Sequence, residues 1–405
     1  MKTIFYRKDT GAIHSTTDGR AKLDAHSMKL GLGVVYVNEY DRRWETIEVA
    51  NGVITGANGV MFGEQRTNRK FTVPYRLTEV VETTSQLSTG NQVRIAFARF
   101  IGIGDILMSL QVALPSLRRS YPDAHITYIT SPVGARLLAA SSYVDSVVKI
   151  DYKHNSSPVV QLPENLEVSQ YNVLINMINR VDFLPIVLKK NRPDNMLSVM
   201  NEQLRTQGRK ACKKQMSIPS IYIGTSSLNW LHRVFQINRL KQPIIGCQLM
   251  SHGVMKHLGV DQWKRLATLC PEYTFLWFGD QGMYADIKDL PENVLNTVST
   301  LNFDEFLTLW SACDATISID SGGAHLSGCF SQPCVVLIGS TKYKDHFLNY
   351  ESTVELQAEQ KLSCQPCIDW QLRSDCKGES VAWCLGNIKP EMIKHKLMRV
   401  LHGNH

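Results

Sequence analysis

Asp105 combines a residue type and a position that could support catalysis. It follows Gly102 and Gly104 directly after the apolar run 93–100, and it lies at the start of an amphipathic helical pattern. A carboxylate aimed at a substrate hydroxyl can accept its proton, but an Asp in the first turn of a helix also complements the helix dipole. The spacing alone leaves catalysis and capping equally open.

A second glycine turn, 320–323, lies in the segment IDSGGAHLSG near the other end of the chain. It separates a predicted strand, 315–319, from a predicted helix, 324–330. Glycines let a ligand approach the backbone, and the N-terminus of a helix favours phosphate. His325 could add a cation or a hydrogen-bond donor. The backbone N–H groups offered to such a ligand are those of Ser321, Gly322, Gly323 and Ala324. A capping serine before small packing residues would look similar.

Four of the ten cysteines form a cluster, CQPC…DC…WC, near the C-terminus. A CxxC pair followed by two more cysteines within about 20 residues is typical of a closed metal site. Four thiolates in a tetrahedral arrangement suit zinc or iron. The alternative is that these cysteines are reduced and bind nothing. The cluster consists of Cys364, Cys367, Cys376 and Cys384.

Each glycine turn lies in its own strand–turn–helix–strand pattern, which predicts a βαβ unit of a parallel sheet. Around Asp105, the flanking strands are the runs 93–100 and 125–130. Ligands of such sheets bind outside the carboxyl ends of the strands, where the glycine turns lie. We therefore expect two Rossmann-like α/β domains that face each other across a cleft.

The chain divides into three predicted domains. Residues 1–88 alternate β-forming residues with Asp-Gly, Asn-Gly and Thr-Gly turns, which predicts a small β domain of hairpins. It would serve folding or assembly, or bind an acceptor. Residues 89–235 form the first Rossmann-like domain, and 236–405 form the second, including a cysteine finger at 361–387.

Composition excludes several classes of protein. The chain has 405 residues, 43% hydrophobic and 20% charged, as expected of a globular protein with more than one domain. It contains no apolar run of about 18 residues, so we expect no membrane span. Because the N-terminus lacks an apolar signal-peptide region, we expect a cytoplasmic protein. The net charge of +7 is scattered along the chain, which argues against a nucleic-acid partner.

Three segments resemble the ADP-heptose-dependent heptosyltransferases, glycosyltransferase family 9. FIGIGDILMSLQVALPSLRRSYPDAHITYI is similar to the opening of these enzymes, and IDSGGAHLSGCFSQPCVVLIGS is similar to their donor-diphosphate segment. CQPCIDW and NIKPEMI resemble their late cysteine segment. The resemblance begins at about residue 93 and implies a GT-B architecture of two Rossmann-like domains facing a cleft.

This resemblance implies roles for the acid–base and phosphate-binding residues. Asp105 would be the base that takes the proton of the acceptor hydroxyl, and a single base opposite the leaving group gives inversion. Lys256 would face the diphosphate, although without the resemblance it reads as an ordinary surface lysine. Ser251, the turn 320–323 and His325 would complete a cradle that replaces a catalytic metal ion.

The resemblance also implies where the sugar and nucleoside lie. Asp320 would order its loop and contact the heptose hydroxyls, or it would be a purely structural turn residue. The family usually has a Glu near the strand end LWFGDQG that binds the ribose, and Asp280 is the substitute here. Gly279 and Gln281 flank it in the same donor-binding segment.

The N-terminal block and the many cysteines resemble the bacterial autotransporter heptosyltransferases. That likeness implies O-heptosylation of Ser or Thr in an autotransporter adhesin passenger, with ADP-heptose as co-substrate. It also implies a structural iron in the four-cysteine site, with zinc as the second choice. The chain would form a homo-oligomer, possibly a dodecameric ring.

Three other functions remain possible from the sequence. A lipopolysaccharide-core heptosyltransferase would share the chemistry but act on a lipid, and the N-terminal block argues against it. A non-catalytic nucleotide-sugar-binding scaffold would not need Asp105, Lys256 and His325. A DNA-base glycosyltransferase is favoured by net charge alone.

Overall fold

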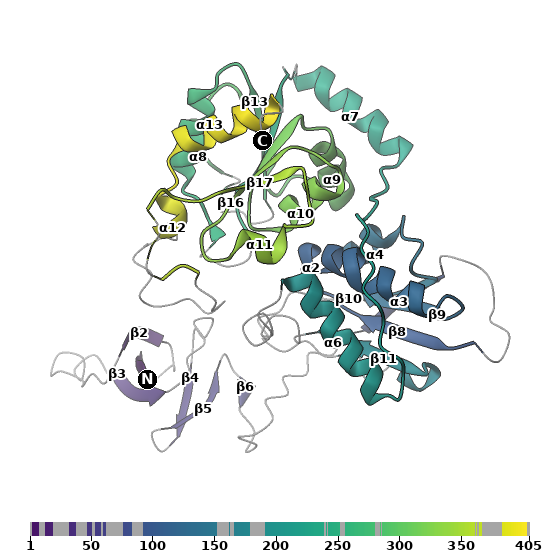
Figure 1. The fold of residues 1–405 in the computed structure, drawn as a ribbon. Helices are drawn as coiled ribbons and strands as arrows, with labels where there is room; N and C mark the ends of the chain where they lie inside the picture. The colour runs from purple at the N-terminus through teal and green to yellow at the C-terminus, as the bar shows by residue number, and fades with distance from the viewer. Residues whose placement is uncertain are drawn as a thin grey trace. The chain divides into compact units, whose positions relative to one another are not determined.

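The structure of the chain is a computed structural model (Figure 1). Of the first 91 residues it describes the strand segments 2–7, 13–18, 32–37, 47–50, 53–57, 60–61 and 76–82. Beyond them it describes 92–151, 162, 166–178, 191–238, 240, 242–251, 256–279, 284, 286–360, 362, 364–366 and 383–402.

The first sheet has five strands in the order β11 (Val173–Asn176), β8 (Arg94–Ala98), β9 (His125–Thr130), β10 (Ser146–Asp151), β7 (Arg76–Glu82). The first four are parallel, and β7 joins the edge antiparallel to β10. Strands β8 and β9 are buried along almost their whole length, as expected of parallel strands covered on both faces. The βαβ unit predicted around Asp105 is confirmed.

The connection from β8 to β9 is a continuous helical stretch made of α2 (Ile103–Met108), the π-helix η1 (Ser109–Ala113) and α3 (Leu114–Ser120). Its apolar residues recur at helical spacing, and those at 106, 110, 114 and 117 are at most 2% exposed. This burial fixes the rotation of the helix and hence the direction in which Asp105 leaves it. The other helices of this half are α4 (Pro132–Leu138), η2 (Val168–Gln170) and α6 (Arg192–Thr206).

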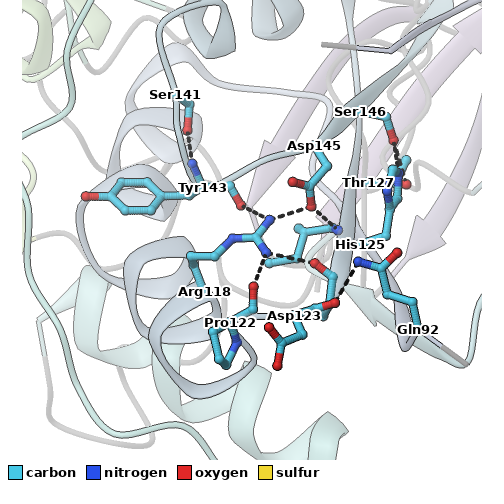
Figure 2. A network of polar contacts seen from close by, with 12 residues as sticks. Gln92, Arg118, Pro122, Asp123, His125, Thr127, Ser141, Tyr143, Asp145 and Ser146 are labelled. Carbon is cyan, nitrogen blue, oxygen red and sulfur yellow. Dashed lines mark hydrogen bonds and ion pairs between the residues drawn. The ribbon is translucent and has the colours of Figure 1, made fainter. Parts of the chain in front are cut away.

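A network of polar contacts fixes the end of α3 to the strands that follow it (Figure 2). Arg118 donates to the carbonyl of Ala124 at 2.7 Å and pairs with the carboxylate of Asp145. The same carboxylate accepts the backbone N–H of Ile126 at 2.7 Å. Because Arg118 is anchored at several points, it holds the amino ends of β9 and β10 in register, at the end of the sheet opposite Asp105.

The second sheet is entirely parallel, with the order β14 (Val294–Asn296), β13 (Thr274–Phe278), β12 (Ile244–Gln248), β15 (Ala315–Ile319), β16 (Cys334–Leu337), β17 (Thr353–Leu356). Its helices are α8 (Val260–Leu269), α9 (Phe303–Ser311), α10 (Gly322–Cys329), α11 (Tyr343–His346), α12 (Trp383–Gly386) and α13 (Pro390–Leu401). The predicted strand–turn–helix around 320–323 is confirmed as β15 and α10. In the described part of the chain, no helix is long and apolar enough to cross a membrane.

One apolar cluster joins the two halves. Leu107 and Leu110 from the first half share it with Trp310 and Leu326 from the second. Helix α7 (Thr225–Asn238) links the halves and packs Phe235 against the same cluster. The domain boundary predicted at 235 therefore falls inside a helix.

The described N-terminal strands form two antiparallel sheets, and the small β domain predicted over 1–88 stays a prediction. The first has the order β2 (Ile13–Asp18), β1 (Lys2–Arg7), β3 (Leu32–Val37), and the second β4 (Ile47–Ala50), β5 (Val53–Ala57), β6 (Val60–Met61). Residues 1–73 and 154–160 form one compact unit, and the rest of the chain forms another. Strand β7, which we placed in the small β domain, instead pairs with β10, because an alternating strand fits any antiparallel edge.

Candidate functional site

Asp105 lies in the first turn of α2, at the carboxyl end of β8. The residue before the helix, Gly102, has φ +80°, and a Cβ there would lie 2.7 Å from Asp105 Oδ2. Only glycine adopts this conformation readily and leaves the space that the carboxylate occupies. The glycine therefore sets the position of Asp105 as well as the turn.

Two arginines flank the carboxylate of Asp105. Arg99 Nη2 donates to Oδ2, and Arg192 Nη1 lies 3.7 Å from Oδ1. Both arginine side chains are 6% exposed, and that of Asp105 is 12% exposed. Oδ1 is buried and accepts no hydrogen bond from the described residues. Oδ2 is thus held by Arg99, while Oδ1 has no hydrogen-bond donor among the described residues.

Asp105 is ionised near neutral pH. Burial raises the pKa of its carboxyl, but the charges of Arg99 and Arg192 and the hydrogen bond from Arg99 outweigh burial, so that the pKa lies below its usual value. The carboxylate is consequently in the form that accepts a proton. This is what the predicted base requires before the acceptor binds.

Asp320 begins the second turn and is the centre of a buried polar network. Lys256 Nζ donates to its Oδ2 at 2.8 Å, and the Thr341 hydroxyl donates to the same oxygen at 2.6 Å. His346 Nδ1 lies 3.4 Å from Oδ1. Burial raises the pKa of Asp320, but Lys256 and His346 together hold it well below the usual range.

His325 lies in the first turn of α10 and is only 2% exposed. Its ring stacks on Phe347 with a centroid distance of 4.6 Å. Burial, with a smaller contribution from His346, lowers its pKa to about 3, so the ring is neutral at physiological pH. Of the two roles considered for His325, a hydrogen-bonding group therefore fits better than a cation. Its Nδ1 has no hydrogen-bond partner among the described residues.

The two glycine turns meet at a seam, which we define as the contact of Ile103 and Gly104, the residues before Asp105, with Gly322 and His325. A Cβ on Gly104 would lie 2.6 Å from the His325 ring, and a Cβ on Gly322 would lie 2.8 Å from Ile103 Cβ. The backbones approach this closely because neither position carries a side chain. Asp105 and His325, distant in sequence, are close enough to affect each other's pKa.

The remaining predicted donor-binding residues lie around the second sheet. The Ser251 carbonyl accepts a hydrogen bond from His257 Nε2 at 3.0 Å, and Ser321 Oγ lies 3.0 Å from Ser318 Oγ. Gly279 follows β13, and Ala324 and Gly323 are buried in α10. Asp280 and Gln281 lie outside the described residues, so their contact with the ribose stays a prediction.

The sequence analysis missed four residues of these networks. Arg99 and Thr341 were detectable in principle, because each follows a buried strand at its carboxyl end, where ligands of parallel sheets bind. No local sequence pattern indicated that Arg192 or His346 would contact these carboxylates. They reach the carboxylates from α6 and α11, which are close to them only in the fold.

Two of the four predicted metal ligands, Cys364 and Cys384, are described, whereas Cys367 and Cys376 lie outside the described residues. Cys384 Sγ lies 2.8 Å from where a Cβ on Gly339 would be, and Gln365 donates to the Gly339 carbonyl at 2.9 Å. Gln365, next to Cys364, and Cys384 thus both lie near Gly339. Among the described residues, no group of three or more His, Cys, Asp or Glu could hold a metal ion. The four-cysteine site remains a prediction.

Solved structures similar to this chain are glycosyltransferases. ADP-heptose lipopolysaccharide heptosyltransferase II of E. coli is 15% identical, with a TM-score of 0.53, over 77% of this chain and 99% of that one. A family 9 glycosyltransferase of Veillonella parvula is 15% identical, with a TM-score of 0.55, over 77% and 97%. No protein-family model and no curated protein matches the chain.

The iron-containing dodecameric heptosyltransferase TibC of E. coli, in complex with ADP-D-beta-D-heptose, is also similar. It is 9% identical, with a TM-score of 0.51, over 100% of this chain and 92% of TibC. At these identities the likeness establishes the fold. The expected resemblance to the family 9 heptosyltransferases is confirmed at that level, with two parallel sheets in an α/β arrangement.

Proposed function

We propose that this protein is an inverting glycosyltransferase that transfers heptose from ADP-heptose to a hydroxyl group at the seam. The observation that carries the proposal is an ionised Asp105 directly next to Ile103 and Gly104, the two residues that contact the second glycine turn. A base and a phosphate-binding turn are the two components that such a transfer needs. The shared fold of the family 9 enzymes supports this choice of donor.

In the proposed reaction, Asp105 accepts the proton of the acceptor hydroxyl as its oxygen attacks C1 of the heptose. The C1–O bond to the β-phosphate breaks on the opposite face, which inverts the anomeric centre. Lys256, Ser251 and the N-terminus of α10 would stabilise the charge that develops on the departing ADP. Asp280 or Gln281 would bind the ribose, and Asp320 would hold Lys256 in place.

We propose that the acceptor is a Ser or Thr of an autotransporter adhesin passenger, modified in the cytoplasm by an oligomer of this chain such as a dodecameric ring. One alignment with TibC covers 100% of this chain and another covers 79% of it, while that with heptosyltransferase II covers 77%. The TibC alignment that includes the N-terminal block is what supports a passenger acceptor. A lipopolysaccharide acceptor, which the shared fold also allows, is the alternative outcome of the test.

The test compares the full chain with a chain that begins at Pro74. The cut keeps β7, which the first sheet needs, and removes most of the N-terminal unit. We expect the shortened chain to bind ADP-heptose like the full chain in calorimetry, since the proposed donor residues lie beyond residue 250, and to lose modification of a purified passenger. If the shortened chain modifies the passenger at the full rate, the N-terminal unit does not bind the acceptor. Transfer by the full chain to a lipopolysaccharide core instead would select the alternative acceptor.

We further propose that Cys364, Cys367, Cys376 and Cys384 hold a structural iron, with zinc as the second choice. Four thiolates would close the coordination sphere, so the metal would contribute folding energy and not catalysis. Elemental analysis should find about one metal ion per chain, as for a single closed site, and Cys364→Ser should lose it. Cys334→Ser, a change at a cysteine inside β16, is the matched control and should keep the metal. Metal-free, fully folded protein purified under reducing conditions would refute the site.

A further inference from the structure

Arg99 binds two backbone carbonyl groups in addition to the carboxylate of Asp105. Its guanidinium is 6% exposed and donates to three groups: Nε to the Ile101 carbonyl at 3.0 Å, Nη1 to the Met177 carbonyl at 3.0 Å, and Nη2 to Asp105 Oδ2. These carbonyls follow β8 and β11, two strands that are neighbours in the first sheet. A planar guanidinium bound on three sides has a single orientation. Arg99 therefore fixes where Oδ2 lies.

The other oxygen of the Asp105 carboxylate, Oδ1, has a different environment. Oδ1 is buried and accepts no hydrogen bond from the described residues, and the nearest recorded cation, Arg192 Nη1, is at 3.7 Å, beyond hydrogen-bond distance. Leaving a buried carboxylate oxygen without a donor is costly, so natural proteins rarely do it without a reason. An acceptor hydroxyl supplies the missing donor.

We propose that Arg99 is a positioning residue that holds Asp105 Oδ2 and thereby leaves Oδ1 as the oxygen that takes the acceptor proton. This rests on the proposed transfer reaction. The proton passes from the acceptor O–H to Oδ1 while the acceptor oxygen bonds to C1. The electron pair of the broken C1–O bond leaves with the β-phosphate as ADP. Asp105 ends the step protonated on Oδ1, with Oδ2 still bound by Arg99.

The other groups that face Asp105 do not duplicate this task. Arg192 on α6 contributes charge without a hydrogen bond at 3.7 Å. His325 on α10 is neutral at physiological pH, because burial lowers its pKa to about 3. Tyr128 on β9 stays protonated, because burial raises its pKa, and its hydroxyl lies 3.0 Å from Ser109 Oγ. A substitution at Arg99 should thus remove the hydrogen bond to Oδ2, while Arg192 still contributes its charge.

The test is the pH profile of kcat for the full chain, measured for Arg99→Lys and Arg99→Met. A lysine keeps the charge but cannot bind three groups at once, so kcat should fall by about 10²-fold, the cost of a misplaced group. Arg99→Met also removes the charge, so the pKa of Asp105 should rise and the acid limb of the profile should move to higher pH. Binding of ADP-heptose should be unchanged in both.

Arg118→Lys is the matched control. Arg118 also pairs with an aspartate and donates to backbone carbonyls, but at the far end of the sheet, so its profile should keep the wild-type shape. An acid limb unmoved in Arg99→Met, or full kcat in Arg99→Lys, would overturn the inference. Asp105→Asn separates the two hypotheses: if that variant turns over normally, the base itself is wrong, whereas if it is inactive while both Arg99 variants behave like wild type, only the role of Arg99 is wrong.

Discussion

Asp105→Asn should lower kcat for transfer by about 10²–10⁴-fold, the usual contribution of a general base. The substitution keeps the size of the side chain and removes its ability to take the acceptor proton. Because the proposed role of Asp105 is toward the acceptor, ADP-heptose should bind with nearly wild-type affinity. Stopped assays of ADP release in the presence of acceptor, together with calorimetry of donor binding, would measure both quantities.

The matched control for Asp105→Asn is Asp145→Asn. Asp145 is also an arginine-paired carboxylate of the first half, but it lies with Arg118 at the opposite end of the sheet. Its loss should reduce stability modestly and leave kcat of the folded protein unchanged. Equal losses of kcat in the two variants would mean that Asp105 acts through folding and not as a base.

Lys256→Met should have a second large effect, on stability and on the donor together. The change leaves Asp320 as a buried carboxylate without its nearest cation, and breaking a buried pair in this way costs about 3–5 kcal/mol of unfolding free energy. ADP-heptose should bind more weakly as well. Thermal unfolding and calorimetric titration at neutral pH would detect the two losses.

The sign of the pH dependence follows from the lowered pKa of Asp320. A depressed carboxyl pKa gives stability that is present above the unfolded pKa, about 3.9, and is lost as the pH falls through the folded value. The stability difference between wild type and Lys256→Met should hence shrink in acid. Adding Asp320→Asn to Lys256→Met should restore part of the stability but not donor binding. Full recovery of donor binding in the double variant would show that Lys256 does not bind the donor.

Local patterns were sufficient to predict the elements that carry the seam. The apolar run before Asp105 and the Gly-Gly pair after Asp320 predicted the strand–turn–helix units that the structure contains. Each pattern is set by residues adjacent in sequence, such as glycines at a turn and apolar residues at helical spacing. The topology of parallel sheets also predicted that Asp105 and Asp320 lie at the carboxyl ends of their strands.

The partners of the carboxylates could not be predicted, because they depend on packing. Arg192 reaches Asp105 from α6, and His346 reaches Asp320 from α11, through contacts that no sequence period encodes. The sheet edge that β7 joins could not be predicted either, since an alternating strand pattern does not specify its partner strand. Without the family resemblance, Lys256 reads as a surface lysine. In the structure it is only 8% exposed, because it pairs with the buried carboxylate of Asp320.

The most direct measurement of the central claim is the intact mass of an autotransporter passenger co-expressed with this chain in cells that make ADP-heptose. With the wild-type chain we expect a ladder of masses separated by one heptose residue, and with Asp105→Asn produced at the same level we expect the unmodified mass. An unmodified passenger with the wild-type chain would show that the chain is not a passenger heptosyltransferase, and the same ladder with both chains would show that Asp105 is not its base.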